Sequence, residues 1–94
     1  MEIRSAQSLM LSLYCERDNT RGSEQTFLWL IEEVGEMAEA LRQRDVGSLN
    51  EEFADVLAWL FSLGNVLGVD LEDAFSKKYD GVCPKCKNIP CGCA

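Results

Sequence analysis

Hydrophobic side chains recur at intervals of three and four residues along most of the chain, which is the spacing of an amphipathic helix. Short runs of polar residues and glycine interrupt this pattern at three places. The pattern therefore predicts an all-α protein. The four predicted helices span about residues 3–18, 24–43, 48–67 and 71–79.

Residues at the interruptions predict where the helices begin and end. Ser48 and Glu51 have the spacing of a capping box, so we expect a turn over Asp45–Gly47 and a helix that starts at Ser48. Gly68 follows the last apolar residue of that helix and is expected to end it. Asp70 is a suitable N-cap for the short helix that follows.

The third predicted helix is apolar around most of its circumference. A helix of this kind is buried on most sides, and a chain of 94 residues can hardly cover it alone. We therefore expect a small one-domain helical bundle that completes its core by forming a homo-oligomer. The apolar residues of this helix are Phe53, Val56, Leu57, Leu60, Phe61, Leu63 and Leu67.

The composition excludes several classes of function. The chain contains no histidine, which rules out Ser-His-Asp and Cys-His catalysis, so any metal must be bound by carboxylates or thiolates. The formal net charge of −7 argues against a nucleic-acid polymer as partner, because binding a phosphate backbone needs a basic face. Residues 1–10 lack the apolar core of a signal peptide, and the apolar stretch 56–63 is too short to span a membrane. We expect a cytoplasmic protein without a membrane partner.

Two short acidic motifs lie on the second and third predicted helices. Glu33 and Glu36 are three residues apart, as are Glu52 and Asp55, so each pair shares one helix face. The short turn between the helices makes them antiparallel neighbours. Counting from that turn places Glu36 and Asp55 at nearly equal heights, and the four carboxylates are expected to gather between the helices.

The surroundings of these acids predict a divalent cation. Glu52 and Asp55 lie on the most apolar helix, where unpaired carboxylates are costly, and no lysine or arginine occurs between Asp45 and Lys77. Clustered carboxylate oxygens suit Mg²⁺ or Mn²⁺. Lys77 and Lys78 end the fourth helix, where they either bind the phosphates of a substrate or complement the helix dipole.

The acidic motifs also carry a family resemblance. The chain resembles the MazG-like all-α nucleoside triphosphate pyrophosphohydrolases over about residues 27–79. The resemblance implies Mg²⁺-dependent hydrolysis of an NTP or dNTP to the monophosphate and pyrophosphate, by a dimer or tetramer. The chain resembles the related phosphoribosyl-ATP pyrophosphohydrolases less, because these usually carry Tyr-His where this chain has Ala58 and Trp59. The segments that carry the resemblance are Trp29–Ala40, Phe53–Leu60 and Leu67–Glu72.

The resemblance implies roles for individual residues. Glu32 would either orient a metal-bound water or act as the general base. Trp59, four residues after Asp55, stands where relatives often carry an aromatic residue near the substrate. Trp59 and Trp29 can each stack on a base or, alternatively, belong to the core or to an interface. The implied metal ligands are Glu33, Glu36, Glu52 and Asp55.

The end of the chain differs from the rest. All 16 acidic residues precede residue 81, and the final segment carries only lysines as charged residues. We therefore predict two units, the helical domain over residues 1–80 and a cysteine-rich tail over residues 81–94. Cys15 lies outside this tail and is expected to be a small buried residue.

Four thiolates in the tail can close a tetrahedral site for a structural Zn²⁺. Disulfides, or a disordered tail with free thiols, are the alternatives. The four cysteines form a C-x2-C-x4-C-x-C pattern over Cys83, Cys86, Cys91 and Cys93.

Two functions of different classes fit these patterns. The acidic motifs favour a Mg²⁺-dependent nucleoside triphosphate pyrophosphohydrolase of the kind that clears nucleotide pools. The cysteine tail and the apolar third helix instead fit a non-enzymatic, zinc-binding oligomeric adaptor. Release of pyrophosphate from a nucleotide would distinguish the two.

Overall fold

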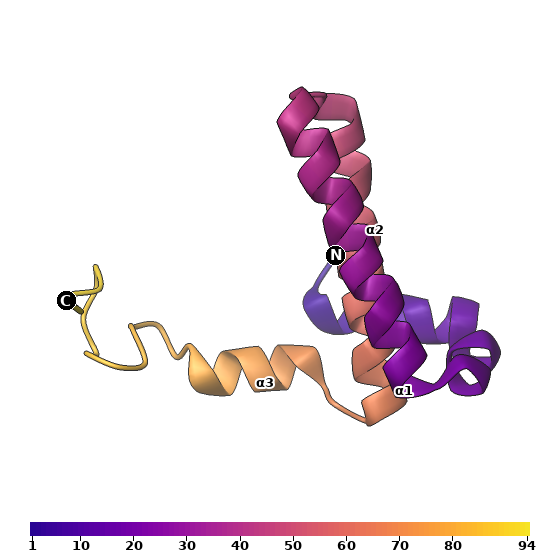
Figure 1. Cartoon of the computed structure of the whole chain (residues 1–94). Coiled ribbons are helices and arrows are strands. Elements are labelled where there is room, and N and C mark those ends of the chain that lie inside the picture. The colour runs from indigo at the N-terminus through magenta and orange to yellow at the C-terminus, as the bar shows by residue number, and fades with distance from the viewer.

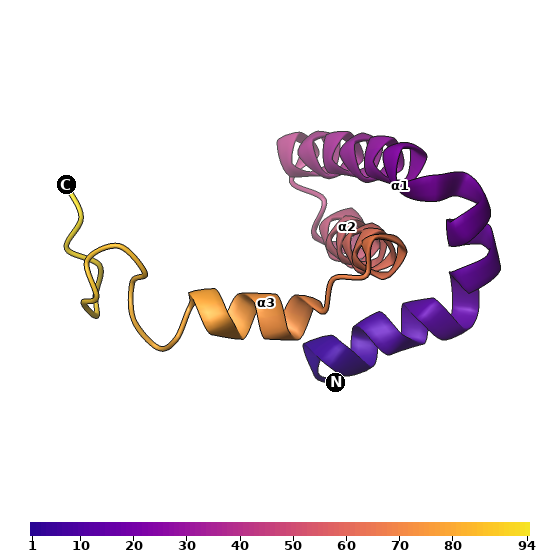
Figure 2. The same cartoon turned by 90° about the horizontal axis from the view of Figure 1, so that it is seen from below.

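The computed structural model describes residues 1–94 and contains helices but no strand, as the pattern of apolar residues predicts (Figure 1). The helices are α1 (Ile3–Gln43), α2 (Val46–Leu67) and α3 (Leu71–Lys78). Residues 23–43 of α1 lie antiparallel beside α2, and we call this pair the hairpin. Helix α3 leaves the hairpin sideways and carries the tail away from it in both views (Figures 1 and 2).

Helix α1 contains a kink at Gly22. The segments on the two sides of this kink correspond to the first two predicted helices, which therefore form one bent helix. Gly22 has φ 83° and ψ 172°, a conformation that only glycine adopts readily. The hydroxyl of the fully buried Thr26 donates to the Gly22 carbonyl at 2.7 Å and fixes the chain on the far side of the kink. The predicted helix end at residue 18 is wrong, because helical structure continues to Arg21.

Residues 3–21 of α1, which we call the N-terminal arm, fold back around one end of α2 (Figure 2). Gln7 fixes this arrangement, because its side chain donates to the Val69 carbonyl at 2.7 Å and accepts from the Leu71 amide at 3.0 Å. Gly64 permits the close approach, since a Cβ atom there would lie 3.0 Å from the Gln7 amide nitrogen. The arm is therefore attached to the link between α2 and α3.

The turn of the hairpin lies earlier in the chain than the sequence predicts. Arg44 adopts a left-handed conformation with φ 57°, and Asp45 caps α2. The Asp45 carboxylate accepts from the Ser48 amide at 3.2 Å and from its hydroxyl at 2.9 Å. The prediction that Ser48 begins the helix is wrong, because Asp45 caps α2 three residues earlier and satisfies the free amide of Ser48. Gly68 ends α2, as predicted.

The single chain covers little of its apolar surface. Leu30 and Ala40 are its only buried hydrophobic residues, whereas Phe53 and Leu57 on α2 remain 56% and 49% exposed. The apolar face of α2 thus extends beyond what α1 covers, and oligomerisation stays a prediction. None of the helices is by itself long and apolar enough to cross a membrane, and only α2 with α3, a pair bent by 98°, reaches such a length and composition.

Candidate active site

Three carboxylates meet between the two helices of the hairpin. Glu33 and Glu36 come from α1 and Glu52 from α2, and one oxygen of each lies within 4.8 Å of the other two. We call these three residues the acidic cluster. The spacing of three residues on α1 places Glu33 and Glu36 one above the other, and the antiparallel α2 brings Glu52 against them. Three of the four predicted metal ligands therefore lie together.

The acidic cluster contains polar atoms that nothing in the chain satisfies. Glu33 Oε2 and Glu52 Oε2 are both buried and have no hydrogen-bond partner. Burial, followed by the neighbouring carboxyl of Glu36 and the charges of Asp55 and Glu52, raises the pKa of Glu33 to about 7. Burial and the charges of Glu36 and Asp55 also raise the pKa of Glu52. Without a cation, ionisation of all three carboxyl groups of the cluster is therefore unfavourable.

These observations fit a hard divalent cation. None of the ion pairs in the chain involves a residue of the acidic cluster, so no basic side chain neutralises it. Carboxylate oxygens that lack donors and lie this close together are the ligand type that Mg²⁺ and Mn²⁺ prefer. The residues present therefore match the cation that the sequence predicts.

The remaining predicted acids lie outside the cluster. Asp55 is exposed on α2, acts on the pKa of Glu33 through its charge, and lines the neighbouring pocket. Glu32 is exposed on α1 beside Glu33. Neither belongs to the group of three whose oxygens converge, so their roles as ligand and general base stay predictions.

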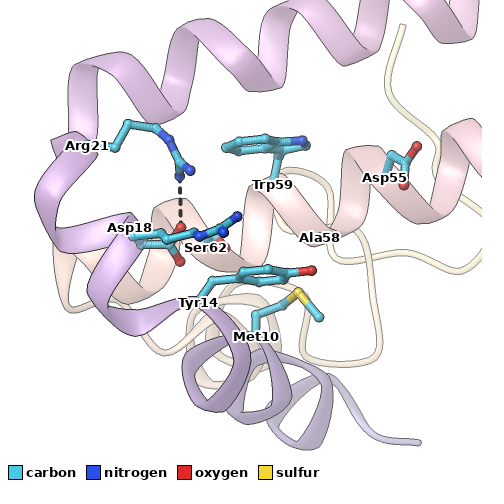
Figure 3. A pocket seen from close by; sticks show the side chains of 9 residues that line it. Met10, Tyr14, Asp18, Arg21, Asp55, Ala58, Trp59 and Ser62 are labelled. Carbon is cyan, nitrogen blue, oxygen red and sulfur yellow. Dashed lines mark hydrogen bonds and ion pairs between the residues drawn. The ribbon is translucent and has the colours of Figure 1, made fainter.

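A pocket of about 240 Å³ opens between α2 and the N-terminal arm, and Asp55, which follows Glu52 by three residues on α2, lines it (Figure 3). Trp59 and Tyr14 lie on opposite sides of it, with Asp18 at one end and Asp55 at the other. The volume is below the roughly 300 Å³ at which pockets for drug-sized ligands begin, so it suits one ring system rather than a whole nucleotide. Its lining residues are Met10, Tyr14, Arg17, Asp18, Arg21, Asp55, Ala58, Trp59 and Ser62.

Trp59 is held in this pocket by contacts on its ring. Trp29 stacks on it with the ring centroids 5.8 Å apart and an angle of 12° between the planes. The guanidinium of Arg21 lies 4.7 Å from the centroid of the Trp59 ring, a cation–π distance. The structure thus brings both predicted tryptophans together at the hairpin, and Trp59 forms part of the pocket wall.

Sequence reasoning missed the half of this pocket that the N-terminal arm supplies. Tyr14 and Arg21 line the pocket, but neither belongs to an acidic motif or to the cysteine tail, so no sequence motif marks them. Asp18 is 3% exposed although it is charged. The change from apolar to charged residues just before Gly22 is the one sequence feature that marks this segment. Only the kink in the structure shows that the segment folds back to the pocket.

The predicted lysines do not reach the acidic cluster within one chain. Lys77 pairs with Asp73 at 3.1 Å, and the Lys78 ammonium lies 5.8 Å from the centroid of the Tyr79 ring. Both lie at the end of α3, which points away from the hairpin (Figure 1). Their contact with a substrate stays a prediction.

The four cysteines of the tail converge on one point. Each offers a sulfur atom, and all four sulfurs lie within 4.8 Å of one another. Cys83 Sγ lies 3.8 Å from Cys93 Sγ, and Cys86 Sγ lies 4.0 Å from Cys91 Sγ. A zinc ion with Zn–S bonds of about 2.3 Å separates its sulfurs by about 3.8 Å in a tetrahedron. The arrangement therefore fits a tetrahedral four-thiolate site.

Backbone amides support the sulfurs of the tail. Gly92 N–H donates to Cys86 Sγ at 3.3 Å, and Cys93 N–H donates to Cys91 Sγ at the same distance. The Gly92 amide is the largest cause that lowers the pKa of Cys86 to about 6. Such bonds favour the thiolate form that binds a metal.

Cys15 is not the buried residue that the sequence predicts. It is exposed on the N-terminal arm, where its sulfur accepts from the Asn19 side chain at 3.4 Å. The arm contacts the rest of the chain through one face only, and Cys15 lies outside that face.

Residues 21–87 match the family model of the MazG nucleotide pyrophosphohydrolase domain, and the chain belongs to this family. The match covers more than half of the chain, from the kink of α1 through α3 to the first two cysteines of the tail. It confirms the resemblance seen in the acidic motifs. The N-terminal arm before residue 21 lies outside the match. No curated protein matches the chain.

Proposed function

We propose that this protein is a Mg²⁺-dependent pyrophosphohydrolase that converts a nucleoside triphosphate, an NTP or dNTP, to the monophosphate and pyrophosphate. The observation that carries the proposal is the acidic cluster, in which Glu33 and Glu52 each leave a buried oxygen without a partner. Membership in the MazG family supports the same activity. We place the protein among the enzymes that clear nucleotide pools.

The residues of the hairpin have distinct tasks in this reaction. Glu33, Glu36 and Glu52 hold the cation, with Asp55 as the fourth ligand at the border of the pocket. A Mg²⁺ held by these carboxylates would supply positive charge for the phosphates and would make a water more acidic. Glu32 orients the attacking water or accepts its proton.

The substrate extends from the acidic cluster into the pocket. Trp59, supported by Trp29, stacks on the base of the nucleotide, because its ring faces the cavity that Asp55 borders. Lys77 and Lys78 bind the polyphosphate. This last step requires α3 to approach the hairpin more closely than it does in one chain.

The direct test is a panel of NTPs and dNTPs incubated with the protein and Mg²⁺, with the products separated and identified. We expect a monophosphate and pyrophosphate from at least one nucleotide, and a similar result with Mn²⁺. Release of orthophosphate with a diphosphate, or no turnover of any member of the panel, would contradict the proposal. The second outcome would leave the zinc-binding adaptor as the better description.

We also propose that Cys83, Cys86, Cys91 and Cys93 hold one structural Zn²⁺. The sulfur separations of 3.8 and 4.0 Å support this, as do the amides that donate to Cys86 and Cys91. Because all four positions of the metal would be filled by protein, the site is structural rather than catalytic. Elemental analysis of the purified chain should give one zinc per chain.

We further propose a homo-oligomer, a dimer or a tetramer. The exposed apolar residues of α2 support it, because Phe53, Leu57 and Leu67 are each about half exposed in the single chain and contiguous apolar surface of this kind marks an interface. Sedimentation velocity should give a mass of at least twice 10.5 kDa. A monomer at micromolar concentration would contradict the prediction.

A further inference from the structure

Two arginines of the N-terminal arm line the pocket, and they differ in what they contact. Arg21 donates from Nη1 to Asp18 Oδ1 at 2.9 Å, and its guanidinium lies 4.7 Å from the centroid of the Trp59 ring. Arg17, one turn earlier on the same helix, is exposed and forms no ion pair. Because a guanidinium carries five N–H donors, Arg17 has donors available to a ligand, and Arg21 has donors beyond the one that Asp18 takes.

The other polar side chains of the pocket do not offset these donors. Asp18 gives Oδ1 to Arg21, and its Oδ2 is buried out of reach of a ligand. Asp55 lies at the opposite end of the pocket (Figure 3). The hydroxyls of Tyr14 and Ser62 can donate or accept, so they favour neither kind of ligand group. A ligand at the Asp18 end therefore meets N–H donors rather than ionised oxygens.

The spacing along α2 places the arginines at the base of a nucleotide rather than at its phosphates. Trp59 follows Glu52 by seven residues, which is about 10 Å of helix. Phosphates held through a cation at the acidic cluster lie near Glu52, whereas Arg21 lies at the level of Trp59, two turns away. A nucleotide that spans this distance has its sugar beside Asp55 and its base beside Trp59, with one edge of the base toward the arginines.

Guanidinium donors distinguish bases by the groups at their edges. A carbonyl oxygen accepts from them, as in the contact of arginine with O6 and N7 of guanine. An exocyclic amino group in the same place sets N–H donors against N–H donors and leaves the guanidinium unpaired. A site with polar groups that pair with one substrate rejects the analogue that fails to pair. Arg17 precedes the part of the chain that matches the family model, so the match assigns it no role.

We propose that Arg17, with Arg21 beside it, donates to the base of the nucleotide and selects bases with a carbonyl oxygen at this edge over their amino counterparts. The ligand class is therefore the nucleotides of uracil, thymine, guanine or hypoxanthine, rather than those of cytosine or adenine. The inference rests on the proposed function for its link to catalysis, but binding of the base is measurable without turnover.

The test compares two pairs of nucleotides that differ along one edge of the base, UTP with CTP and ITP with ATP. With Mg²⁺, kcat/KM is measured for each nucleotide. In a chelator, the monophosphates of the same four bases are titrated against the tryptophan fluorescence of the full chain. We expect the oxo member of the better-bound pair to be favoured by roughly 10-fold or more in both measurements. Equal constants within both pairs, or no change in fluorescence with any of the four monophosphates, would overturn the proposal.

Two variants separate base selection from a general effect of positive charge. Arg17→Gln replaces the guanidinium by an amide that both donates and accepts, so we expect the ratio within each pair to fall toward one. Arg42→Gln is the matched control, because Arg42 lies on the same helix outside the pocket and pairs only with Glu39. It should leave the ratios unchanged. If Arg17→Gln weakens both members of a pair equally, and triphosphates more than monophosphates, Arg17 binds phosphate and the proposal is overturned.

The remaining outcomes are also decisive. If Arg17→Gln does not fold, as judged by circular dichroism, Arg17→Lys takes its place. Lysine keeps the charge but lacks the fork of donors, so we expect a smaller oxo preference, and an undiminished one would overturn the role of Arg17. If the titration shows the oxo preference but no nucleotide is hydrolysed, base selection is supported and the proposed reaction is not. If nucleotides are hydrolysed without preference within either pair, the reaction is supported and base selection by Arg17 is overturned.

Discussion

The acidic cluster and the cysteine tail both gather ligands for a metal, but the surroundings of Glu33 and Cys86 shift the pKa values of these two ligands in opposite directions. Burial raises the pKa of Glu33 to about 7, whereas amide donors, Gly92 first, lower the pKa of Cys86 to about 6. Backbone amides of the tail support negative charge on Cys86, whereas the neighbouring sulfurs, Cys91 first, raise the pKa of Cys93. The acidic cluster lacks such support and depends on a cation.

The two centres also differ in what positions them. The acidic cluster depends on the register of two long helices, since Glu52 meets Glu33 and Glu36 only across the hairpin. The tail is organised by short-range bonds, such as the Lys87 amide to the Cys83 carbonyl at 2.8 Å. A centre held by local turns can be lost without loss of the hairpin. We therefore predict that a substitution can disrupt the sulfur site while the carboxylate site keeps its structure and activity.

The largest expected effect comes from exchanging ligands in each centre. Glu52→Gln should reduce kcat/KM by about 100-fold or more. Replacing a residue that only hydrogen-bonds to a metal ligand typically reduces affinity or activity by about 10–100-fold, and replacing the ligand itself should cost more. Cys86→Ser should abolish stoichiometric zinc and change turnover by no more than about 2-fold. Zinc content and pyrophosphate release are measured on both variants.

The neighbouring Glu51 provides the matched control. It is exposed on the same turn of α2 and forms no ion pair, so Glu51→Gln should behave as wild type in both assays. If Cys86→Ser abolished turnover while the hairpin stayed folded, the two centres would not be separable.

The next largest effect tests the pocket independently of the acidic cluster and the cysteine tail. Trp59→Ala should raise KM by roughly 10–100-fold, because stacking of a base on an aromatic ring contributes about 1–3 kcal/mol. Trp29→Ala should have a smaller effect, since Trp29 acts through Trp59. Zinc content should not change in either variant. Equal KM values for Trp59→Ala and wild type would contradict binding of the base in this pocket.

A pair of glycine substitutions tests how the hairpin and the arm are joined. Gly22→Ala should destabilise the helical domain by about 1–3 kcal/mol, because φ 83° with ψ 172° is strained for any residue with a Cβ. Gly35 is helical with open space around its Cβ position, so Gly35→Ala should stabilise the domain by about 0.5–1 kcal/mol. Urea denaturation measures both.

The two glycine variants also have informative failures. Destabilisation by Gly35→Ala would indicate that this face of α1 packs against another chain. No effect of Gly22→Ala would mean that the kink is not required for the fold. Zinc binding by the tail should survive both substitutions if the centres are independent.

The smallest expected effect is a pH dependence that belongs to the acidic cluster alone. Between pH 4.5 and about pH 7 the unfolded chain has lost the Glu33 proton while the folded chain retains it. Raising the pH through this window therefore lowers the free energy of unfolding. In chelator, Glu33→Gln should show a shallower decline than wild type by urea denaturation. Identical slopes would contradict the shift.

Much of the fold follows from local sequence pattern. Apolar spacing predicts the helices, and Gly68 and Asp70 predict the link between α2 and α3, which the structure confirms. The placement of Glu33 with Glu36 follows from a separation of three residues, because one helical turn brings them together whatever lies around them. The four cysteines converge within eleven positions for the same reason, since short turns suffice.

The tertiary structure decided what depends on long-range geometry. The sequence places Glu36 level with Asp55, but the turn at Arg44 and Asp45 lies earlier and brings Glu52 into the group with Glu36 instead. A shift of the turn by one or two residues changes which side chains face each other across antiparallel helices, and no local pattern fixes it to that precision.

The pocket shows the same division between local and long-range information. The sequence alone determined that an all-α chain carries clustered carboxylates, two tryptophans and four neighbouring cysteines. Only the kink at Gly22 decided that the N-terminal arm folds back over Trp59 and brings a buried Asp18 to the same cavity. The direction that the chain takes after a single left-handed residue depends on packing against α2, and packing is a property of the folded molecule rather than of the segment.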